Sequence, residues 1–216
     1  AGTGELVASA IIKAAEKTGM PNGVFSNLNS SGIEVGQELV AHSKVKAVGF
    51  TGSIKGGRAL LDIAAKREEP IPVFAEMGSI NPVVILPKAL DNRNEEIAKT
   101  YAGSITLGAG QFCTNPGLIL GIKSDSLSVF INHLSQEIMD INPSCMLHPN
   151  IKKGYDANKD KVVAQAKVSI TANYESDVQN NYAQQAVVSV DGKSFLENPT
   201  LHLEVFGPFS MVVECA

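Results

Sequence analysis

The residue best suited to covalent chemistry in this sequence is a cysteine that follows a glycine-rich turn. A Gly-Ala-Gly run at 108–110 comes shortly before Cys113. Glycines let the backbone adopt positive φ and approach a ligand closely, and backbone N–H groups on such a turn can hold an oxyanion. The arrangement suits a thiol that attacks a carbonyl carbon. A lone cysteine is more often a small buried hydrophobe, so this interpretation depends on the rest of the chain.

A second candidate site is the run Phe-Thr-Gly-Ser at 50–53, which stands between a predicted strand and a predicted helix. The free N–H groups at a helix N-terminus, a hydroxyl and the absence of a bulky Cβ are typical of a phosphate loop. Taken alone the run is weak, because strand-to-helix turns often use Gly and Ser only to cap the helix. Neither of the common nucleotide-binding fingerprints, GxGxxG and GxxxxGK[ST], is present.

Composition and charge exclude several classes of protein. The net charge of −4 over 216 residues provides no basic field for nucleic acid or an anionic membrane. The three cysteines are far apart and form no CxxC pair, and their odd number argues against a disulfide framework and favours a reducing compartment. The four scattered histidines form no ligand pair, so we expect no metal site. No apolar run reaches the length of a membrane span. We therefore expect a soluble, cytoplasmic protein.

The first part of the chain reads as alternating helices and strands. The hydrophobic periodicity predicts helices over 5–17, 34–42 and 57–66, and strands over 24–28, 45–50 and 70–75. Strands and helices that alternate through short connections are typical of βαβ units on a parallel sheet. In such sheets ligands bind beyond the carboxyl ends of the strands. The fold class predicted from this pattern is α/β.

After Asn81-Pro82, which we interpret as a domain boundary, the pattern resumes. It predicts helices over 92–107, 125–141 and 151–172, and strands over 83–86, 118–122, 186–190, 201–205 and 211–213. The helix over 125–141 has the clearest 3.6-residue period. The residues 173–185 read as a loop or irregular edge, and 191–192 as a turn. The strands near the end of the chain are expected to form a second sheet.

Five short runs occur in an order and at spacings that resemble the aldehyde dehydrogenase superfamily. They span nearly the whole chain and are Phe-Thr-Gly-Ser at 50–53, Glu-Met-Gly-Ser at 76–79, Asn-Pro at 81–82, Gly-Gln-Phe-Cys at 110–113 and Glu-Val-Phe-Gly-Pro at 204–208. Each run alone is weak to moderate evidence, whereas five in order are specific. The sequences around 76–82 and 107–118 are most similar to the branch that oxidises α-ketoglutarate semialdehyde (2,5-dioxovalerate).

The resemblance implies catalytic roles for two residues. Cys113 would be the nucleophile, whose thiolate adds to an aldehyde to give a thiohemiacetal that is oxidised to a thioester. Glu76 would be the general base that activates the water which hydrolyses this thioester. NAD or NADP would accept the hydride. Without the flanking runs, Glu76 would read as an ordinary solvated carboxylate at a strand end.

The same resemblance implies cofactor contacts at the predicted phosphate loop. Gly52 and Ser53 would face the pyrophosphate at the start of a helix, and Thr51 would approach the nicotinamide. The family has a Rossmann-like cofactor domain without the usual glycine fingerprint, which accounts for its absence here.

Four further positions match cofactor contacts of the family. Gly32 and Gly36 correspond to glycines that let the dinucleotide lie close to a helix. Glu204 would bind the nicotinamide ribose hydroxyls, and Phe206 would pack near the nicotinamide ring. Turn and packing roles for the two glycines, and a plain core role for Phe206, stay open.

The resemblance also implies a domain organisation and an extent. Residues 1–79 would be the C-terminal part of a Rossmann-like NAD(P)-binding domain, and 80–216 an α/β catalytic domain that is incomplete at its C-terminus. Family members are more than twice this length, and they form dimers or tetramers. We therefore expect a homo-oligomeric parent enzyme that acts on a small aldehyde, and little or no activity from this excerpt alone.

Two alternatives come from other classes. The chain could be a non-catalytic remnant that keeps the fold without turnover. It could also be an esterase-like or acyl-transfer protein that uses the same thiol without hydride transfer. Binding of NAD(P)⁺ separates aldehyde oxidation from acyl transfer, and turnover separates it from the remnant.

Overall fold

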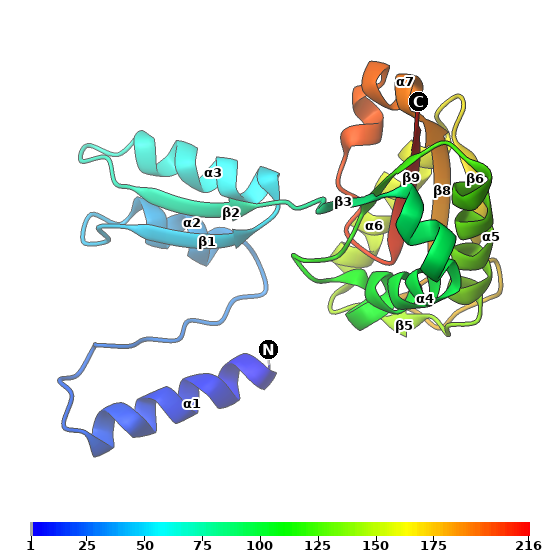
Figure 1. The fold of residues 1–216 in the computed structure, drawn as a ribbon. Coiled ribbons are helices and arrows are strands. Elements are labelled where there is room, and N and C mark those ends of the chain that lie inside the picture. The colour runs from blue at the N-terminus through cyan, green and yellow to red at the C-terminus, as the bar shows by residue number, and fades with distance from the viewer. Residues whose placement is uncertain (1) are drawn as a thin grey trace. The chain divides into compact units, whose positions relative to one another are not determined.

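The computed structural model describes residues 2–216, and the chain divides into two compact units (Figure 1). The N-terminal unit runs to Met77, and the C-terminal unit comprises Gly78–Ala216. No helix among residues 2–216 is long and apolar enough to cross a membrane.

The N-terminal unit contains three helices and two strands. In chain order these are α1 (Gly2–Lys17), α2 (Glu34–Ala41), β1 (Val48–Gly52), α3 (Ile54–Ala65) and β2 (Val73–Met77). The strands β1 and β2 are parallel and pair from Val48 opposite Val73 to Gly52 opposite Met77. The predicted strand–helix–strand unit on a parallel sheet is confirmed here, and the predicted helices over 5–17, 34–42 and 57–66 are present within a few residues.

The core of this unit is small. Its buried members are Val40, Ala64 and Ile71, with partly buried apolar side chains around them. The helix α3 lies close to β2 because Gly57 faces Met77, where a Cβ would come within 2.3 Å of the methionine sulfur.

The predicted strand over 24–28 is wrong. Residues 25–30 have no regular secondary structure, and all of 21–34 are exposed. The apolar residues of the segment match a strand, but a strand is stable only when its backbone groups pair with a neighbour. Within residues 2–77, only β1 and β2 form such a pair.

The C-terminal unit is built on one five-stranded sheet. Its larger elements are β3 (Pro82–Ile85), α4 (Pro87–Thr106), β4 (Leu118–Ile122), α5 (Asp125–Met139), α6 (Pro149–Val163), β6 (Ser169–Asn173), β8 (Ala186–Asp191) and β9 (Phe209–Cys215). The smaller ones are the turn η1 (Leu107–Gly110), β5 (Ser144–Cys145), β7 (Tyr182–Ala183), α7 (Gly192–Glu197) and the 3₁₀ helix η2 (Pro199–His202). The sheet order is β3-β4-β9-β8-β6, in which only β6 is antiparallel to its neighbour.

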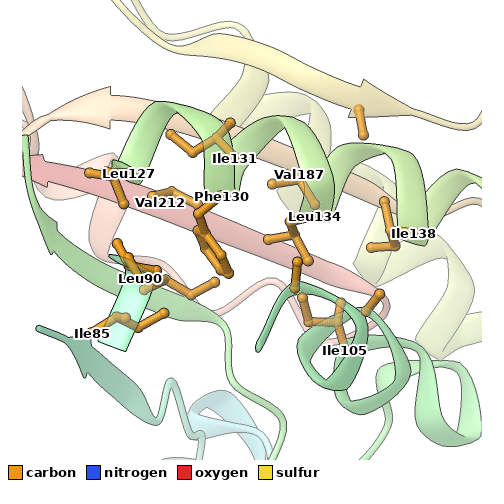
Figure 2. Packing of buried hydrophobic residues seen from close by; sticks show 14 residues of the cluster. Ile85, Leu90, Ile105, Leu127, Phe130, Ile131, Leu134, Ile138, Val187 and Val212 are labelled. Carbon is orange, nitrogen blue, oxygen red and sulfur yellow. The ribbon is translucent and has the colours of Figure 1, made fainter. Parts of the chain in front are cut away.

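Each face of this sheet carries its own core. On one face, α4 and α5 pack against the sheet, and Figure 2 shows Phe130 and Leu134 of α5 directed toward Leu90 and Ile105 of α4. On the other face, a second cluster includes Tyr155 of α6 and side chains of β8 and β9. The central strands β8 and β9 are buried on both faces, as their continuous apolar runs require.

Two predictions in this unit are wrong. The helix predicted over 151–172 ends at Val163, because Lys167 adopts a φ of 65° and the chain then forms β6 against β8. The predicted strand over 201–205 begins instead as η2, with Pro199 at its first position and the Asn198 side chain capping the Thr200 N–H. Proline at a helix start and an Asn cap are the local signals that outweigh the apolar alternation.

The predicted turn at 191–192 is the start of α7. The Asp191 carboxylate accepts hydrogen bonds from the Ser194 N–H at 2.9 Å and from the Ser194 hydroxyl at 2.6 Å. The remaining predicted strands and helices of this half are present within a few residues. The predicted α/β fold class is confirmed.

Candidate active site

The turn before Cys113 has a left-handed backbone. Gly108, Ala109 and Gly110 have φ values of 56°, 56° and 66°. Such values are open to glycine but cost an alanine roughly 1–2 kcal/mol, so the buried Ala109 is held there by its surroundings. A Cβ on Gly110 would lie 2.2 Å from the carbonyl carbon of Gly207. This contact requires glycine and packs the turn against the 204–208 loop.

The side chain of Gln111 makes two hydrogen bonds that hold the turn in place. Its amide nitrogen donates to the Gly108 carbonyl at 2.8 Å, and its amide oxygen accepts from the Leu147 N–H at 2.9 Å. The Gln111 side chain thus links the turn to the segment at Leu147.

Hydrogen bonds orient both peptide groups that flank Cys113, whose side chain is exposed. The Phe112 carbonyl accepts from the Asn115 N–H at 3.0 Å. The Cys113 carbonyl accepts from the Ser79 hydroxyl at 2.5 Å and the Asn81 amide at 2.7 Å. Because a trans peptide directs its N–H opposite to its carbonyl, the N–H groups of Cys113 and Thr114 are oriented too.

Those two N–H groups donate to no acceptor within residues 78–216. Consecutive backbone N–H groups held in this way are suited to an anion. Such donors beside an exposed thiol are what a developing oxyanion would need.

Two asparagines and one serine connect the loops of the site, and the sequence analysis did not select them as site residues. Asn81 has a φ of 50° and also donates to the Asn115 carbonyl at 2.9 Å. The Asn115 side chain donates to the Gly207 carbonyl at 3.1 Å. Ser79, Asn81 and Asn115 all lie in or beside the five runs that resemble the family. Asn-Pro pairs in loops, where an amide can bond nearby carbonyls, were the available signal.

The predicted cofactor residues Glu204 and Phe206 lie on the loop that faces this turn. Glu204 accepts a hydrogen bond from the Ser79 N–H at 2.9 Å through one carboxylate oxygen. Both residues, with Ser79 and Phe112, help to line a small cavity of about 70 Å³. The structure thus brings Cys113, Glu204 and Phe206 into one region of the C-terminal unit.

The helix α6 contacts the 204–208 loop through Tyr155 and Asn158. The Asn158 amide donates to the Glu204 carbonyl at 3.0 Å, and the Tyr155 hydroxyl donates to the Gln184 carbonyl at 2.6 Å. A Cβ on Gly207 would lie 2.2 Å from the Tyr155 ring. Burial raises the pKa of Tyr155, and the neighbouring acidic side chains of α6 add to the shift. The phenol therefore stays protonated and acts as a donor.

The other predicted residues gather at one edge of the N-terminal unit. Thr51 and Gly52 end β1, and Glu76 is the register partner of Thr51 on β2. Ser53 caps α3, and its hydroxyl accepts from the Gly56 N–H at 3.1 Å. The first N–H groups of α3 have no partner within the helix. A helix start with a glycine and a serine in front of it fits a diphosphate.

Gly32 and Gly36 lie just before and within α2. A Cβ on Gly36 would meet nothing within 4 Å, and one on Gly32 would meet only the flexible side chain of Glu34. Packing inside the chain therefore does not require glycine at either position. Their role as cofactor contacts stays a prediction.

The predicted site residues thus form two clusters, one in each unit. Thr51, Gly52, Ser53 and Glu76 belong to the N-terminal cluster, and Cys113 belongs with the 204–208 loop in the C-terminal one. In the part of the chain that the structure describes, no three His, Cys, Asp or Glu side chains come together as metal ligands, and the three cysteines are free.

Comparison with known proteins identifies the class. The model of the aldehyde dehydrogenase family matches residues 1–216, so the chain belongs to the aldehyde dehydrogenase family. It is 45% identical over 214 residues to alpha-ketoglutaric semialdehyde dehydrogenase 2 of Azospirillum brasilense, covering 99% of this chain and 41% of the relative. It is 41% identical over 212 residues to alpha-ketoglutaric semialdehyde dehydrogenase of Acinetobacter baylyi, covering 98% of this chain and 40% of the relative. The chain therefore spans about two fifths of the length of these relatives.

Solved structures share the fold at lower identity. Gamma-glutamyl-gamma-aminobutyraldehyde dehydrogenase from Burkholderia cenocepacia matches with a TM-score of 0.76 and 22% identity, over 96% of this chain and 42% of that one. An NAD-dependent benzaldehyde dehydrogenase from Corynebacterium glutamicum matches with a TM-score of 0.74 and 21% identity, over 93% of this chain and 43% of that one. These likenesses establish an aldehyde dehydrogenase-type α/β fold.

Proposed function

We propose that this chain carries the nucleophile and part of the cofactor site of an NAD(P)-dependent aldehyde dehydrogenase. The observation that carries the proposal is the exposed Cys113 beside two N–H groups without acceptors within 78–216. A nucleophile that attacks a carbonyl needs donors where the oxyanion develops. The left-handed turn and the bonds from Ser79 and Asn81 hold those donors in place.

The substrate class that we propose is a small aldehyde, and specifically α-ketoglutarate semialdehyde. Support comes from the names of the two relatives at 45% and 41% identity. The runs around Glu76 and Cys113 also resemble that branch of the family.

In the proposed reaction, the Cys113 thiolate forms a bond to the aldehyde carbon, and the carbonyl oxygen takes the negative charge. The N–H groups of Cys113 and Thr114 would stabilise this oxygen. NAD or NADP, when bound, supplies the oxidation by accepting a hydride from that carbon. Glu76 would take a proton from water, whose oxygen then displaces the Cys113 sulfur from the resulting thioester and releases the carboxylate.

The cofactor contacts are proposed for seven residues: Gly32, Gly36, Thr51, Gly52, Ser53, Glu204 and Phe206. The start of α3 would hold the diphosphate through its free N–H groups, supported by the Ser53 cap. Glu204 has one carboxylate oxygen bonded to the Ser79 N–H, and its other oxygen has no partner within 78–216. That second oxygen would accept hydrogen bonds from ribose hydroxyls.

We assign residues 1–79 to the cofactor domain and 80–216 to the catalytic domain. The activity is proposed for a longer parent protein, because the chain spans 41% and 40% of its two relatives. We propose that this parent is a cytoplasmic homo-oligomer, as the family resemblance implies. The isolated 216 residues are expected to oxidise aldehydes slowly or not at all. Ready turnover by the purified chain would contradict that expectation.

The direct test is alkylation of the native chain by iodoacetamide, with each cysteine followed by peptide mass spectrometry between about pH 5 and 9. Cys145 is a matched internal control, because its side chain is exposed like that of Cys113. We expect Cys113 to react first and NAD⁺ or NADP⁺ to bind. Equal labelling of Cys113 and Cys145 would contradict the nucleophile assignment. Selective labelling together with binding of NAD⁺ or NADP⁺ would support aldehyde oxidation over acyl transfer.

A further inference from the structure

One residue contacts both parts of the C-terminal site. Ser79 donates twice, from its backbone N–H to a Glu204 carboxylate oxygen at 2.9 Å and from its hydroxyl to the Cys113 carbonyl at 2.5 Å. Glu204 is 125 positions away in sequence and Cys113 is 34. The Ser79 side chain therefore makes no local hydrogen bond within residues 78–216. Its single hydroxyl proton is donated to the turn that carries Cys113.

The bond to the Cys113 carbonyl has a consequence for the next peptide group. A planar trans peptide fixes the Thr114 N–H opposite to the Cys113 carbonyl. Asn81 shares the same carbonyl at 2.7 Å, which fills both of its lone pairs. The direction of one candidate oxyanion donor is thus set by side chains of the 79–81 segment.

The hydrogen bond from the Ser79 N–H restrains the Glu204 side chain. A charge-assisted hydrogen bond from the Ser79 N–H holds one carboxylate oxygen. The Asn158 amide holds the Glu204 backbone carbonyl at 3.0 Å. Side chain and backbone of Glu204 are therefore both restrained, and the free carboxylate oxygen is the one available to a ligand.

We propose that Ser79 is a positioning residue that couples Glu204 to the Cys113 turn, an inference that rests on the proposed function. A ligand that draws on the Glu204 carboxylate acts on the Ser79 backbone, and the Ser79 hydroxyl transmits that change to the peptide beside the thiol. The coupling needs no contact between the ligand and Cys113.

A double-mutant cycle on the 216-residue chain tests this coupling. Its readout is the alkylation rate of Cys113 relative to Cys145 in the same sample. Ser79→Ala keeps the N–H to Glu204 and removes only the bond to Cys113, so we expect Cys113 to react about fivefold more slowly. Glu204→Ala is expected to slow it about threefold, and the double variant to be no slower than Ser79→Ala alone.

Three controls separate positioning from general destabilisation. Ser79→Thr retains the hydroxyl and should restore the rate. Ser128→Ala removes a hydroxyl that also bonds a backbone carbonyl, at 3.1 Å, and should leave the rate unchanged. Cys215, which is only partly exposed, should label no faster in any variant.

The outcomes distinguish this inference from the proposed function. An unchanged Cys113 rate in Ser79→Ala, or effects of Ser79→Ala and Glu204→Ala that simply multiply, would overturn the coupling. A wild-type Cys113 that is no faster than Cys145 would instead contradict the nucleophile assignment, whatever the variants do.

Discussion

The two units of this chain differ in how much core each has of its own. The C-terminal unit buries two clusters, one on each face of a five-stranded sheet. The N-terminal unit has a two-stranded sheet and a cluster with three buried residues, Val40, Ala64 and Ile71. Two strands with little apolar cover are marginal by themselves, whereas five strands between helices are not. The turn that carries Cys113 therefore belongs to the better-packed unit, and the predicted phosphate loop to the unit with the smaller core.

The largest test of this difference is a pair of core truncations. Phe130 is fully buried and meets Tyr101 edge-to-face, with ring centroids 6.3 Å apart. We expect Phe130→Ala to lower the free energy of unfolding of the C-terminal unit by about 3–5 kcal/mol. Leu60 is only partly buried against the small cluster, so Leu60→Ala should cost the N-terminal unit about 1 kcal/mol. Hydrogen exchange in increasing urea reports each unit separately. Equal losses would show that the units share one stability.

A pair of glycine substitutions sharpens the comparison inside the C-terminal unit. Gly110 has a φ of 66° and lies against Gly207, so Gly110→Ala should destabilise this unit by about 2–4 kcal/mol and disturb the Cys113 turn. Gly103 is exposed on α4 and a Cβ there would meet nothing within 4 Å. Gly103→Ala should stabilise by up to about 1 kcal/mol. Chemical denaturation measures both, and similar behaviour of the two would contradict the close approach to Gly207.

The smallest expected effects are changes in the free energy of unfolding at acid pH. The Ser194 hydroxyl, followed by the Ser194 N–H, lowers the pKa of Asp191 below its ordinary 3.8. A folded pKa below the unfolded one contributes stability above about pH 4, and this contribution is lost as pH falls through the folded pKa. Asp191→Asn keeps a capping oxygen but cannot titrate. The unfolding free energy of the C-terminal unit should then fall less steeply below about pH 4.

The matched acid test in the N-terminal unit uses Glu69. A hydrogen bond and the charge of Lys46 lower the pKa of Glu69 below 4.5, in an exposed ion pair. Glu69→Gln should change acid stability only at low salt, because exposed pairs are screened. If Glu69→Gln changed the unfolding free energy at acid pH more than Asp191→Asn does, the expected order of the two effects would be wrong.

Local patterns in the sequence were sufficient for most elements. The strand over 118–122 is an apolar run and the helix from Asp125 has a clear 3.6-residue period, and both appear as predicted. The segment 24–28 had a strand-like composition without a partner, and residues 164–172 a helix-like composition beside a strand edge. Both predictions failed because pairing with a distant segment, and not composition, decides whether a strand forms.

The sequence by itself determined the family, through five runs in order, and with it the candidate residues Cys113, Glu76 and Glu204. Only the tertiary structure showed that Ser79 contacts both Cys113 and Glu204, and that Gly110 packs on Gly207. Residue types and short spacings encode turns, caps and periodic faces. A hydrogen bond across 125 residues depends instead on how the whole sheet places its loops, and no local pattern in the sequence specifies that.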